Sequence, residues 1–446
     1  MSKKARKPLL ASERRTSLLL LLVSLLVMSL AVFVGACGGE EETTTTAAPG
    51  TETTAAPTET TAAPVTETTG PAVELPDTIK VGAVIPLTGS FSGLGSQVRG
   101  GYELAVAQIN EAGGVDIGGT KVPIELTILD DESDPTKTVQ QLETLKSAGV
   151  VAYLGGAGSP LHAAAAGIAE KNQIPYLGVG FGVLAPHLQG FKYLFSPFQK
   201  SNDQARTTFE VIDTLSPAPT NVAIFKETTD WGKELDGFWT EEATKRGMTI
   251  KTYEYAPGTT DYSSIILPAK DSGADVLLGL PTPPDGLAIL KQAKELDWNP
   301  SMILMIRAPD PPTFGENLGV DSDGVMLMPG WNRAVDFPGS AEMVEAYNAK
   351  FNAPAVALTG PAYACVQILA DAISRAGVVE PGAIRDAMAA TDMDTVIGPV
   401  TFEEDGTGNV VDVVNQWQGG KQALVWPLEQ PNASKIIYPL VPWKDR

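Results

Sequence analysis

The chain has 446 residues, of which 53 are acidic and 32 basic, so its formal net charge is −21. This acidic balance excludes a general basic surface for nucleic acid, and we expect no nucleic-acid partner. Cys37 and Cys365 are the two cysteines. Because Cys37 has a separate predicted role, no internal disulfide is expected.

The first 36 residues have the layout of a secretory signal peptide. Basic residues lie between positions 3 and 15, an apolar stretch runs from Leu18 to Ala36, and small residues precede Cys37. The ending Val34-Gly35-Ala36-Cys37 resembles the bacterial lipobox, in which cleavage leaves a lipid-bearing N-terminal cysteine. This resemblance predicts an extracytoplasmic protein that is lipid-anchored to the cell membrane through Cys37. The apolar stretch is also long enough to span a bilayer, so an uncleaved signal anchor is the alternative.

Residues 37–76 form a low-complexity segment that follows the predicted cleavage site. Threonine, glutamate, alanine and proline dominate it, and Thr-Thr-Ala-Ala-Pro occurs three times. Such a composition cannot build a core, so we expect a disordered, Thr-rich tether. A glycosylated stalk is the other interpretation of the same composition.

From Asp77 onward, the remaining residues are too many for one small domain and indicate two lobes. Short apolar runs rich in β-branched residues alternate with amphipathic helical patterns, which predicts βαβ units. The strand candidates are Ile79–Ile85, Ile124–Leu129, Val150–Leu154, Tyr176–Val179, Asn221–Phe225, Ile250–Tyr255, Val276–Leu280, Met302–Ile306 and Gly324–Met328. The predicted fold class is α/β, with mostly parallel sheets flanked by helices.

The pattern changes near the C-terminal end. Gly398–Phe402, Val410–Trp417 and Gln422–Trp426 are separated by glycine-containing turns and indicate an antiparallel strand and hairpin.

Loops of small residues follow three of the predicted strands. They are residues 86–93 after Ile85, residues 155–159 after Leu154 and residues 180–182 after Val179. In open α/β sheets, ligands bind outside the carboxyl ends of the strands, and exposed backbone N–H groups beside a helix start favour anions. Three such loops together favour a binding cleft, although each could also serve only as a tight turn.

An ordered set of short motifs follows the exported part of the chain. It comprises Ile85-Pro86-Leu87-Thr88-Gly89, Ile109-Asn110-Glu111-Ala112-Gly113-Gly114, Asp130-Asp131 with Asp134-Pro135, Gly155-Gly156-Ala157-Gly158-Ser159, Ile174-Pro175, Asp230-Trp231-Gly232, and Gly398-Pro399-Val400-Thr401-Phe402 with Asp405-Gly406. The set resembles the branched-chain amino-acid-type solute-binding proteins of ABC importers, which are Leu/Ile/Val-binding-protein-like.

This resemblance implies the type I periplasmic-binding-protein fold, in which three crossover strands join two lobes around a cleft. We expect the first lobe to comprise residues 77–198 plus 333–398. The second lobe would then comprise residues 199–332 plus 399–446.

The resemblance also implies positions for the ligand. Ser159 and the cluster Gly180, Phe181 and Gly182 correspond to the groups that hold an amino-acid carboxylate, with Gly182 replacing the usual threonine. Trp231 corresponds to an aromatic residue that covers the ligand from the second lobe, although it could instead pack inside that lobe.

The main departure from the family pattern is Arg307, which lies in the loop where amino-acid binders place an acidic partner for the ligand ammonium. Arg307 could hold a carboxylate in the cleft or be solvated on its loop. Asp310 or Asp285 could supply the missing negative charge. The ligand is therefore open between an amino acid and an aromatic or aliphatic carboxylate, an amide or a urea-like solute.

Four aromatic residues are expected to form an apolar wall for the ligand. They are Phe91, Phe181, Trp231 and Trp331.

The predicted function is solute capture by cleft closure and delivery to an ABC permease and its ATPase. We expect a monomer without cofactor or metal, and the alternative is a sensor of the same fold. Catalysis is disfavoured because Phe91 stands where the nucleophile of a Gly-x-Ser-x-Gly motif would lie. The two histidines, His162 and His187, have no metal-like spacing, and Cys365 lies on an apolar helical face typical of a core thiol.

Overall fold

The computed structural model describes residues 74–446. The predicted signal peptide, Cys37 and the tether up to residue 73 lie outside the described residues. Within residues 74–446, no single helix is long and apolar enough to cross a membrane. Helices α10 (Thr359–Ala376) and α11 (Pro381–Ala389) would be long and apolar enough to span a membrane only if taken together. They are bent by 111° to each other.

The first lobe is built on a five-stranded parallel sheet with the order β4-β1-β5-β6-β7. Its strands are β1 (Ile79–Ile85), β4 (Ile124–Asp130), β5 (Ala152–Leu154), β6 (Tyr176–Leu177) and β7 (Leu194–Phe195). In β1, Val81 and Ala83 face the core that contains α1 and α10, whereas Val84 faces the core under α2. This alternation is the period of two that a strand buried on both faces requires.

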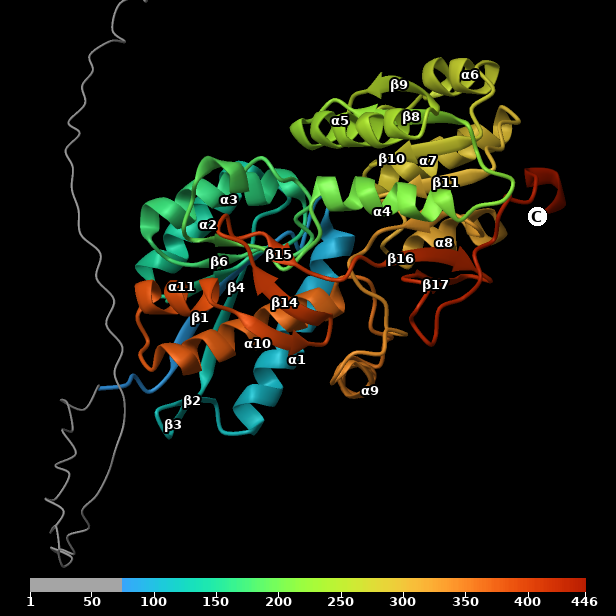
Figure 1. The fold of residues 1–446 in the computed structure, drawn as a ribbon. Coiled ribbons are helices and arrows are strands. Elements are labelled where there is room, and N and C mark those ends of the chain that lie inside the picture. The colour runs from blue at the N-terminus through green and yellow to red at the C-terminus, as the bar shows by residue number, and fades with distance from the viewer. Residues whose placement is uncertain (1–73) are drawn as a thin grey trace, which may run out of the picture. The chain divides into compact units, whose positions relative to one another are not determined.

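Helices cover both faces of this first sheet. The helices α1 (Ser92–Glu111), α9 (Ser340–Phe351), α10 and α11 belong to one side, and α2 (Pro135–Ser147) and α3 (Ser159–Asn172) to the other (Figure 1). Local sequence sets where they begin. Asp134, for example, accepts a hydrogen bond from the N–H of Thr136, and Pro135 occupies the first helical position of α2.

The second lobe is built on a seven-stranded sheet with the order β17-β16-β12-β11-β10-β8-β9. The parallel strands are β8 (Asn221–Glu227), β9 (Thr249–Tyr255), β10 (Val276–Gly279), β11 (Met302–Met305) and β12 (Met326–Leu327). An antiparallel hairpin, β16 (Val414–Gln418) and β17 (Lys421–Trp426), extends one edge. The helices are α4 (Ser201–Asp213), α5 (Asp230–Lys245), α6 (Ser263–Asp271), α7 (Pro283–Glu295) and α8 (Thr313–Leu318).

Smaller strands complete the first lobe. They are the hairpin of β2 (Val115–Ile117) and β3 (Thr120–Val122), and the antiparallel sheet of β13 (Asp392–Thr395), β14 (Gly398–Phe402) and β15 (Gly408–Asn409). An isolated bridge also joins Thr407 to Ser196, directly after β7.

The chain passes between the two sheets three times, through residues 196–200, 328–339 and 410–413. The predicted lobe border at residues 398 and 399 therefore moves to 410–413, because β14 and β15 pair with β13 beside the first sheet. The prediction of an α/β fold with parallel sheets flanked by helices is confirmed, as is the antiparallel hairpin near the C-terminal end.

Candidate functional site

A small cavity lies between the two sheets, at the carboxyl ends of their parallel strands. Its lining residues come from both lobes and from the connections: Leu94, Ala157, Gly158, Gly180, Phe198, Gln204, Trp231, Ile306, Arg307, Asp310, Met328 and Leu358. The volume open to the centre of a water molecule is about 20 Å³, which corresponds to roughly one water. The two lobes are therefore closed around this cavity. Two of the three loops predicted to bind a ligand contribute to its lining, one through Ala157 and Gly158 and the other through Gly180.

Unpaired donors lie next to the first-lobe lining of the cavity, which includes Gly158 and Gly180. Ser159 begins α3, is 1% exposed, and its Oγ has no hydrogen-bond partner. Among the hydrogen bonds of the described residues, none is donated by the backbone N–H groups of residues 180–183. Buried N–H groups are almost always paired in proteins. Free N–H groups beside the start of a helix therefore form a site suited to an anion such as a carboxylate.

Trp231 of α5 covers the loop at Gly182. A Cβ atom at Gly182 would lie 2.6 Å from Cζ2 of Trp231, so the indole occupies the space into which a side chain at residue 182 would project. The indole Nε1 donates a hydrogen bond to Ser201 Oγ at 3.1 Å. The glycine that departs from the family pattern is thus matched to the tryptophan above it.

Arg307 lies at the cavity and is not a solvated loop residue. It is 5% exposed, and its guanidinium lies 5.2 Å from the Trp231 ring centroid and 5.7 Å from that of Phe91. Its backbone φ of 82° is in the left-handed region, which is unfavourable for a non-glycine residue.

A buried carboxylate compensates the charge of Arg307. Glu227, at the end of β8, forms an ion pair with the Arg307 guanidinium and is 2% exposed. The guanidinium also donates to the carbonyl oxygens of Leu280 and Pro281. Sequence reasoning missed Glu227, although its place at the carboxyl end of a parallel strand was a signal that could have identified it.

Asp310 and Gln204 are the other polar side chains at the cavity. Asp310 is 5% exposed, and its Oδ1 has no hydrogen-bond partner. Burial raises the pKa of Asp310 to about 8, and the nearby positive charge of Arg307 opposes this rise. Gln204 is fully buried, and neither its amide oxygen nor its amide nitrogen has a partner.

Ser159, Gly182 and Phe91 lie next to the lining of the cavity, and three further predicted ligand contacts have side chains that lie away from it. Asp285 lies inside the second lobe, where its Oδ2 accepts a 3.4 Å hydrogen bond from the N–H of Gly258. Trp331 is fully buried and donates to the carbonyl of Val396, so it anchors the second connection to the first lobe. The third, Phe181, contributes its backbone to the loop, but its side chain points into the first lobe.

Phe181 is sandwiched between the two histidines of the chain. Its ring centroid lies 4.6 Å from that of His162 and 5.2 Å from that of His187. His162 Nδ1 and Nε2 contact Tyr176 Oη and the Val179 carbonyl, and burial lowers the pKa of His162 to about 3. Burial likewise lowers the pKa of His187 to about 3. Both imidazoles therefore act as neutral core residues.

Phe91 packs beside the cavity and does not line it. It precedes α1, is 7% exposed, and lies within contact distance of the position that a Cβ atom at Gly158 would occupy. Its contribution is to support the guanidinium of Arg307 from the first lobe.

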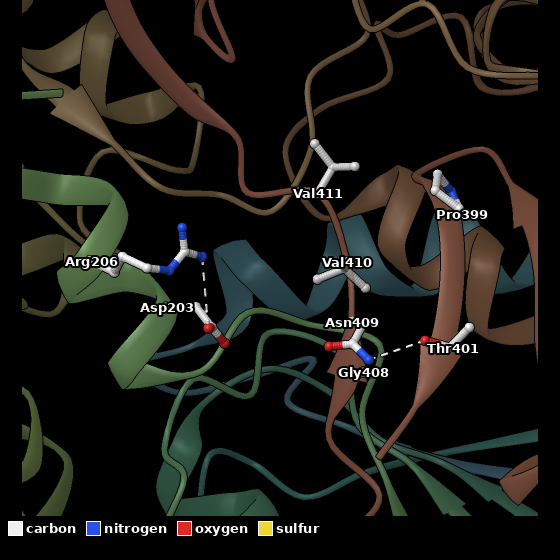
Figure 2. Close-up of a pocket in the computed structure, with 8 residues that line it drawn as sticks. All are labelled: Asp203, Arg206, Pro399, Thr401, Gly408, Asn409, Val410 and Val411. Atoms are coloured by element: carbon white, nitrogen blue, oxygen red, sulfur yellow. Dashed lines mark hydrogen bonds and ion pairs between the residues drawn. The ribbon is translucent and has the colours of Figure 1, made fainter. Parts of the chain in front are cut away.

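A second, larger cavity of about 390 Å³ lies between α4 and the strands β14 and β15 (Figure 2). It is lined by Asp203, Arg206, Pro399, Thr401, Gly408, Asn409, Val410 and Val411. Its polar side chains are already paired, as in the contacts between Arg206 and Asp203 and between Asn409 and Thr401. This groove therefore lacks the unpaired buried groups that distinguish the cavity between the sheets.

Similarity to known proteins agrees with this geometry. Residues 78–421 match the family described as periplasmic binding protein. The Leu/Ile/Val-binding protein homolog 8 of Brucella abortus (strain 2308) is 28% identical over 371 residues, which cover 78% of this chain and 90% of that protein.

Solved structures share the fold. A leucine binding protein from Thermotoga maritima has a TM-score of 0.71 and 24% identity, covering 78% of this chain and 97% of its own. A branched-chain amino acid transporter substrate binding protein from Streptococcus pneumoniae, in complex with isoleucine, has a TM-score of 0.70 and 22% identity, covering 77% and 97%. A solute binding protein from R. palustris, in complex with benzoate, has a TM-score of 0.67 and 18% identity, covering 81% and 99%. On the match across residues 78–421, the chain belongs to the periplasmic binding protein family.

Proposed function

We propose that this protein is the solute-binding component of an ABC importer and that its ligand is an amino acid or a close zwitterionic analogue. The observation that carries the proposal is that hydrogen-bond donors and a carboxyl group lie on opposite sides of one closed cavity. Free N–H donors lie on the first-lobe side, and the unpaired carboxyl of Asp310 lies on the second-lobe side.

The first-lobe side would receive the ligand carboxylate. Ser159 offers a hydroxyl and the positive end of α3, and residues 180–183 offer backbone donors. Hydrogen bonds to an ionised group are about twice as strong as neutral ones. Placing a carboxylate there would satisfy several buried donors at once.

The second-lobe side would receive the ligand ammonium. Arg307 and Asp310 are the ionisable residues that line the cavity, and Glu227 already compensates the charge of Arg307. The charge left without a partner is therefore that of Asp310 when it ionises. Because Glu227 neutralises Arg307, an amino acid is favoured as the ligand over a carboxylate that lacks an ammonium.

Closure explains how the ligand would be held. With room for roughly one water between the lobes, a solute can enter only when the lobes separate at residues 196–200, 328–339 and 410–413. Leu94, Met328 and Leu358 would then close over an aliphatic side chain. Binding shifts the population toward the closed form without any chemical step on the ligand.

A thermal-shift screen of the purified protein tests this proposal. We expect L-leucine or L-isoleucine to raise the melting temperature, since a ligand specific to the native state stabilises it. At matched concentration, 4-methylpentanoate, which lacks the ammonium, and isopentylamine, which lacks the carboxylate, should produce little shift. A larger shift with 4-methylpentanoate or benzoate would overturn the ligand assignment and restore the carboxylate role of Arg307.

As a periplasmic binding protein the chain is extracytoplasmic, and we further propose that it acts as a monomer anchored by lipid at Cys37. The support is the lipobox-like sequence Val34-Gly35-Ala36-Cys37. In a bacterial host grown with labelled palmitate, the wild-type protein should carry the label and Cys37→Ser should not. Equal labelling of both would exclude this anchor, and light scattering of the purified protein would test the monomer.

A further inference from the structure

The first connection between the lobes contacts the ligand loop directly. We propose that Lys200 and Ser201 are positioning residues that fix two consecutive peptide units of the loop and so aim the N–H groups of Gly182 and Val183 at the ligand. This inference rests on the proposed function in one respect, which is that a bound solute accepts hydrogen bonds from these N–H groups.

Two neighbouring side chains hold two neighbouring carbonyls. The Nζ of Lys200 donates to the carbonyl oxygen of Phe181 at 2.6 Å and to Ser196 Oγ at 2.6 Å. The hydroxyl of Ser201 donates to the carbonyl oxygen of Gly182 at 3.0 Å. Lys200 and Ser201 are the residues at which α4 begins, so the rigid start of a helix supplies both donors.

Peptide planarity converts these contacts into an orientation of the amides. The C=O and N–H groups of one trans peptide unit point in opposite directions. Holding the Phe181 carbonyl toward Lys200 therefore directs the N–H of Gly182 away from the connection. The same argument applies to the Gly182 carbonyl and the N–H of Val183. Neither N–H has an acceptor among the described residues.

The loop needs such a constraint because of its composition. Phe181 is flanked by Gly180, whose φ is +64°, and by Gly182. Glycine populates both signs of φ, so peptide units beside it can reorient at low energetic cost. Without Lys200 and Ser201, the two N–H groups would lose their common direction.

The burial of Lys200 supports a functional reason for its presence. It is 1% exposed, and burial lowers its pKa to about 7. The Phe181 ring centroid lies 4.4 Å from Nζ. A buried ammonium is costly, and apolar residues of similar volume often serve stability as well or better. A lysine at this position is therefore better explained by its hydrogen bond to the loop than by packing.

Trp231 links the arrangement to the second lobe. Ser201 Oγ accepts a hydrogen bond from the Trp231 indole while it donates to the Gly182 carbonyl. The residue that covers the cavity from one lobe thus contacts the hydroxyl that orients the loop of the other.

The test compares Lys200→Met with Ser196→Ala, which removes the other acceptor of Lys200 and leaves the loop contact intact. With L-leucine as the probe, we expect Lys200→Met to weaken binding about 30-fold or more. Ser196→Ala should remain within about threefold of the wild type. The melting temperature of Lys200→Met should not fall in proportion to the lost affinity. Wild-type affinity in Lys200→Met would overturn the proposal.

A second pair keeps the proposal testable if Lys200→Met does not fold. Ser201→Ala should weaken L-leucine binding about tenfold, and Ser201→Thr, which retains the hydroxyl, should restore it. Equal affinities of the two variants would count against the proposal.

A crystal structure of Lys200→Met separates this inference from the ligand assignment. If L-leucine does not bind the wild type, the proposed ligand fails. The orientation of the peptide unit between Phe181 and Gly182 still tests the positioning role, because this unit should reorient in the Lys200→Met crystal structure. An unchanged peptide would contradict the positioning role.

Discussion

Replacing Asp310 by asparagine should change how the stability of the protein depends on pH. The folded-state pKa of Asp310 is about 8, above its ordinary value of 3.8, because the carboxyl is buried. Between these values the folded protein binds more protons than the unfolded chain. The stability contributed by Asp310 therefore falls as the pH rises from about 4 to about 8. Asparagine keeps the shape of the side chain and removes this ionisation.

The expected magnitude follows from the size of the pKa difference. Each pH unit inside the window corresponds to about 1.4 kcal/mol, so the wild type should lose roughly 4 kcal/mol relative to Asp310→Asn between pH 5 and pH 8. Urea unfolding at a series of pH values measures this difference. Asp271→Asn removes the same charge from the exposed end of α6 and controls for net charge. A constant difference between Asp310→Asn and the wild type across this range would refute the burial argument.

The same group makes a separate prediction about ligand binding. At pH 7 a carboxyl of pKa about 8 is about 90% protonated. A ligand ammonium paired with Asp310 should lower this pKa and release about 0.9 protons per molecule bound. Calorimetry in phosphate and in Tris would measure the release as a dependence on buffer ionisation enthalpy. Proton uptake, or no buffer dependence, would contradict an ammonium at Asp310.

The remaining predictions concern other contacts of the two lobes. Gly182→Ala should weaken L-leucine binding about tenfold or more, because the new Cβ atom would lie 2.6 Å from the Trp231 ring. Titration calorimetry measures this affinity, and an unchanged value would argue against the close approach. Arg307→Met should destabilise the protein by about 3–5 kcal/mol in urea unfolding, because it leaves Glu227 buried and unpaired. Adding Glu227→Gln should recover much of this loss, and an equally unstable double variant would mean that the ion pair is not the cause. Burial raises the pKa of Asp412 to about 6, so the free energy of unfolding of Asp412→Asn should increase by roughly 2–3 kcal/mol relative to that of the wild type between pH 4 and pH 7. Urea unfolding measures this change, and a constant difference across the range would contradict it.

The parts of the fold that were predictable from sequence are those whose pattern is local. The predicted strands Ile79–Ile85 and Gly398–Phe402 begin and end at the same residues as β1 and β14 of the structure. The two-residue strand β7 (Leu194–Phe195) is too short to show a period, and the polar strand β13 forms through pairing with β14. The predicted strand Val410–Trp417 begins late, at Val414, because residues 410–413 pass between the lobes.

The candidate site likewise contains parts that could be predicted from the sequence and parts that could not. The loops at Ser159 and Gly180 could be predicted because they follow strand ends in a parallel sheet. The partner of Arg307 could not, since Glu227 lies 80 residues away in the chain and meets it only in the folded sheet. The inward direction of Phe181 was equally hidden, because the stacking with His162 decides it.

The interleaved order of the two lobes along the chain has a consequence for biogenesis. Helix α10 packs against α1 in the first-lobe core, yet it is made about 250 residues later, after the parallel strands of the second sheet. At a synthesis rate of about 5–20 residues per second, that interval lasts on the order of 12–50 s. The core of the first lobe cannot close during this time. The synthesis of α10 therefore sets the earliest moment at which the core of the first lobe can be completed.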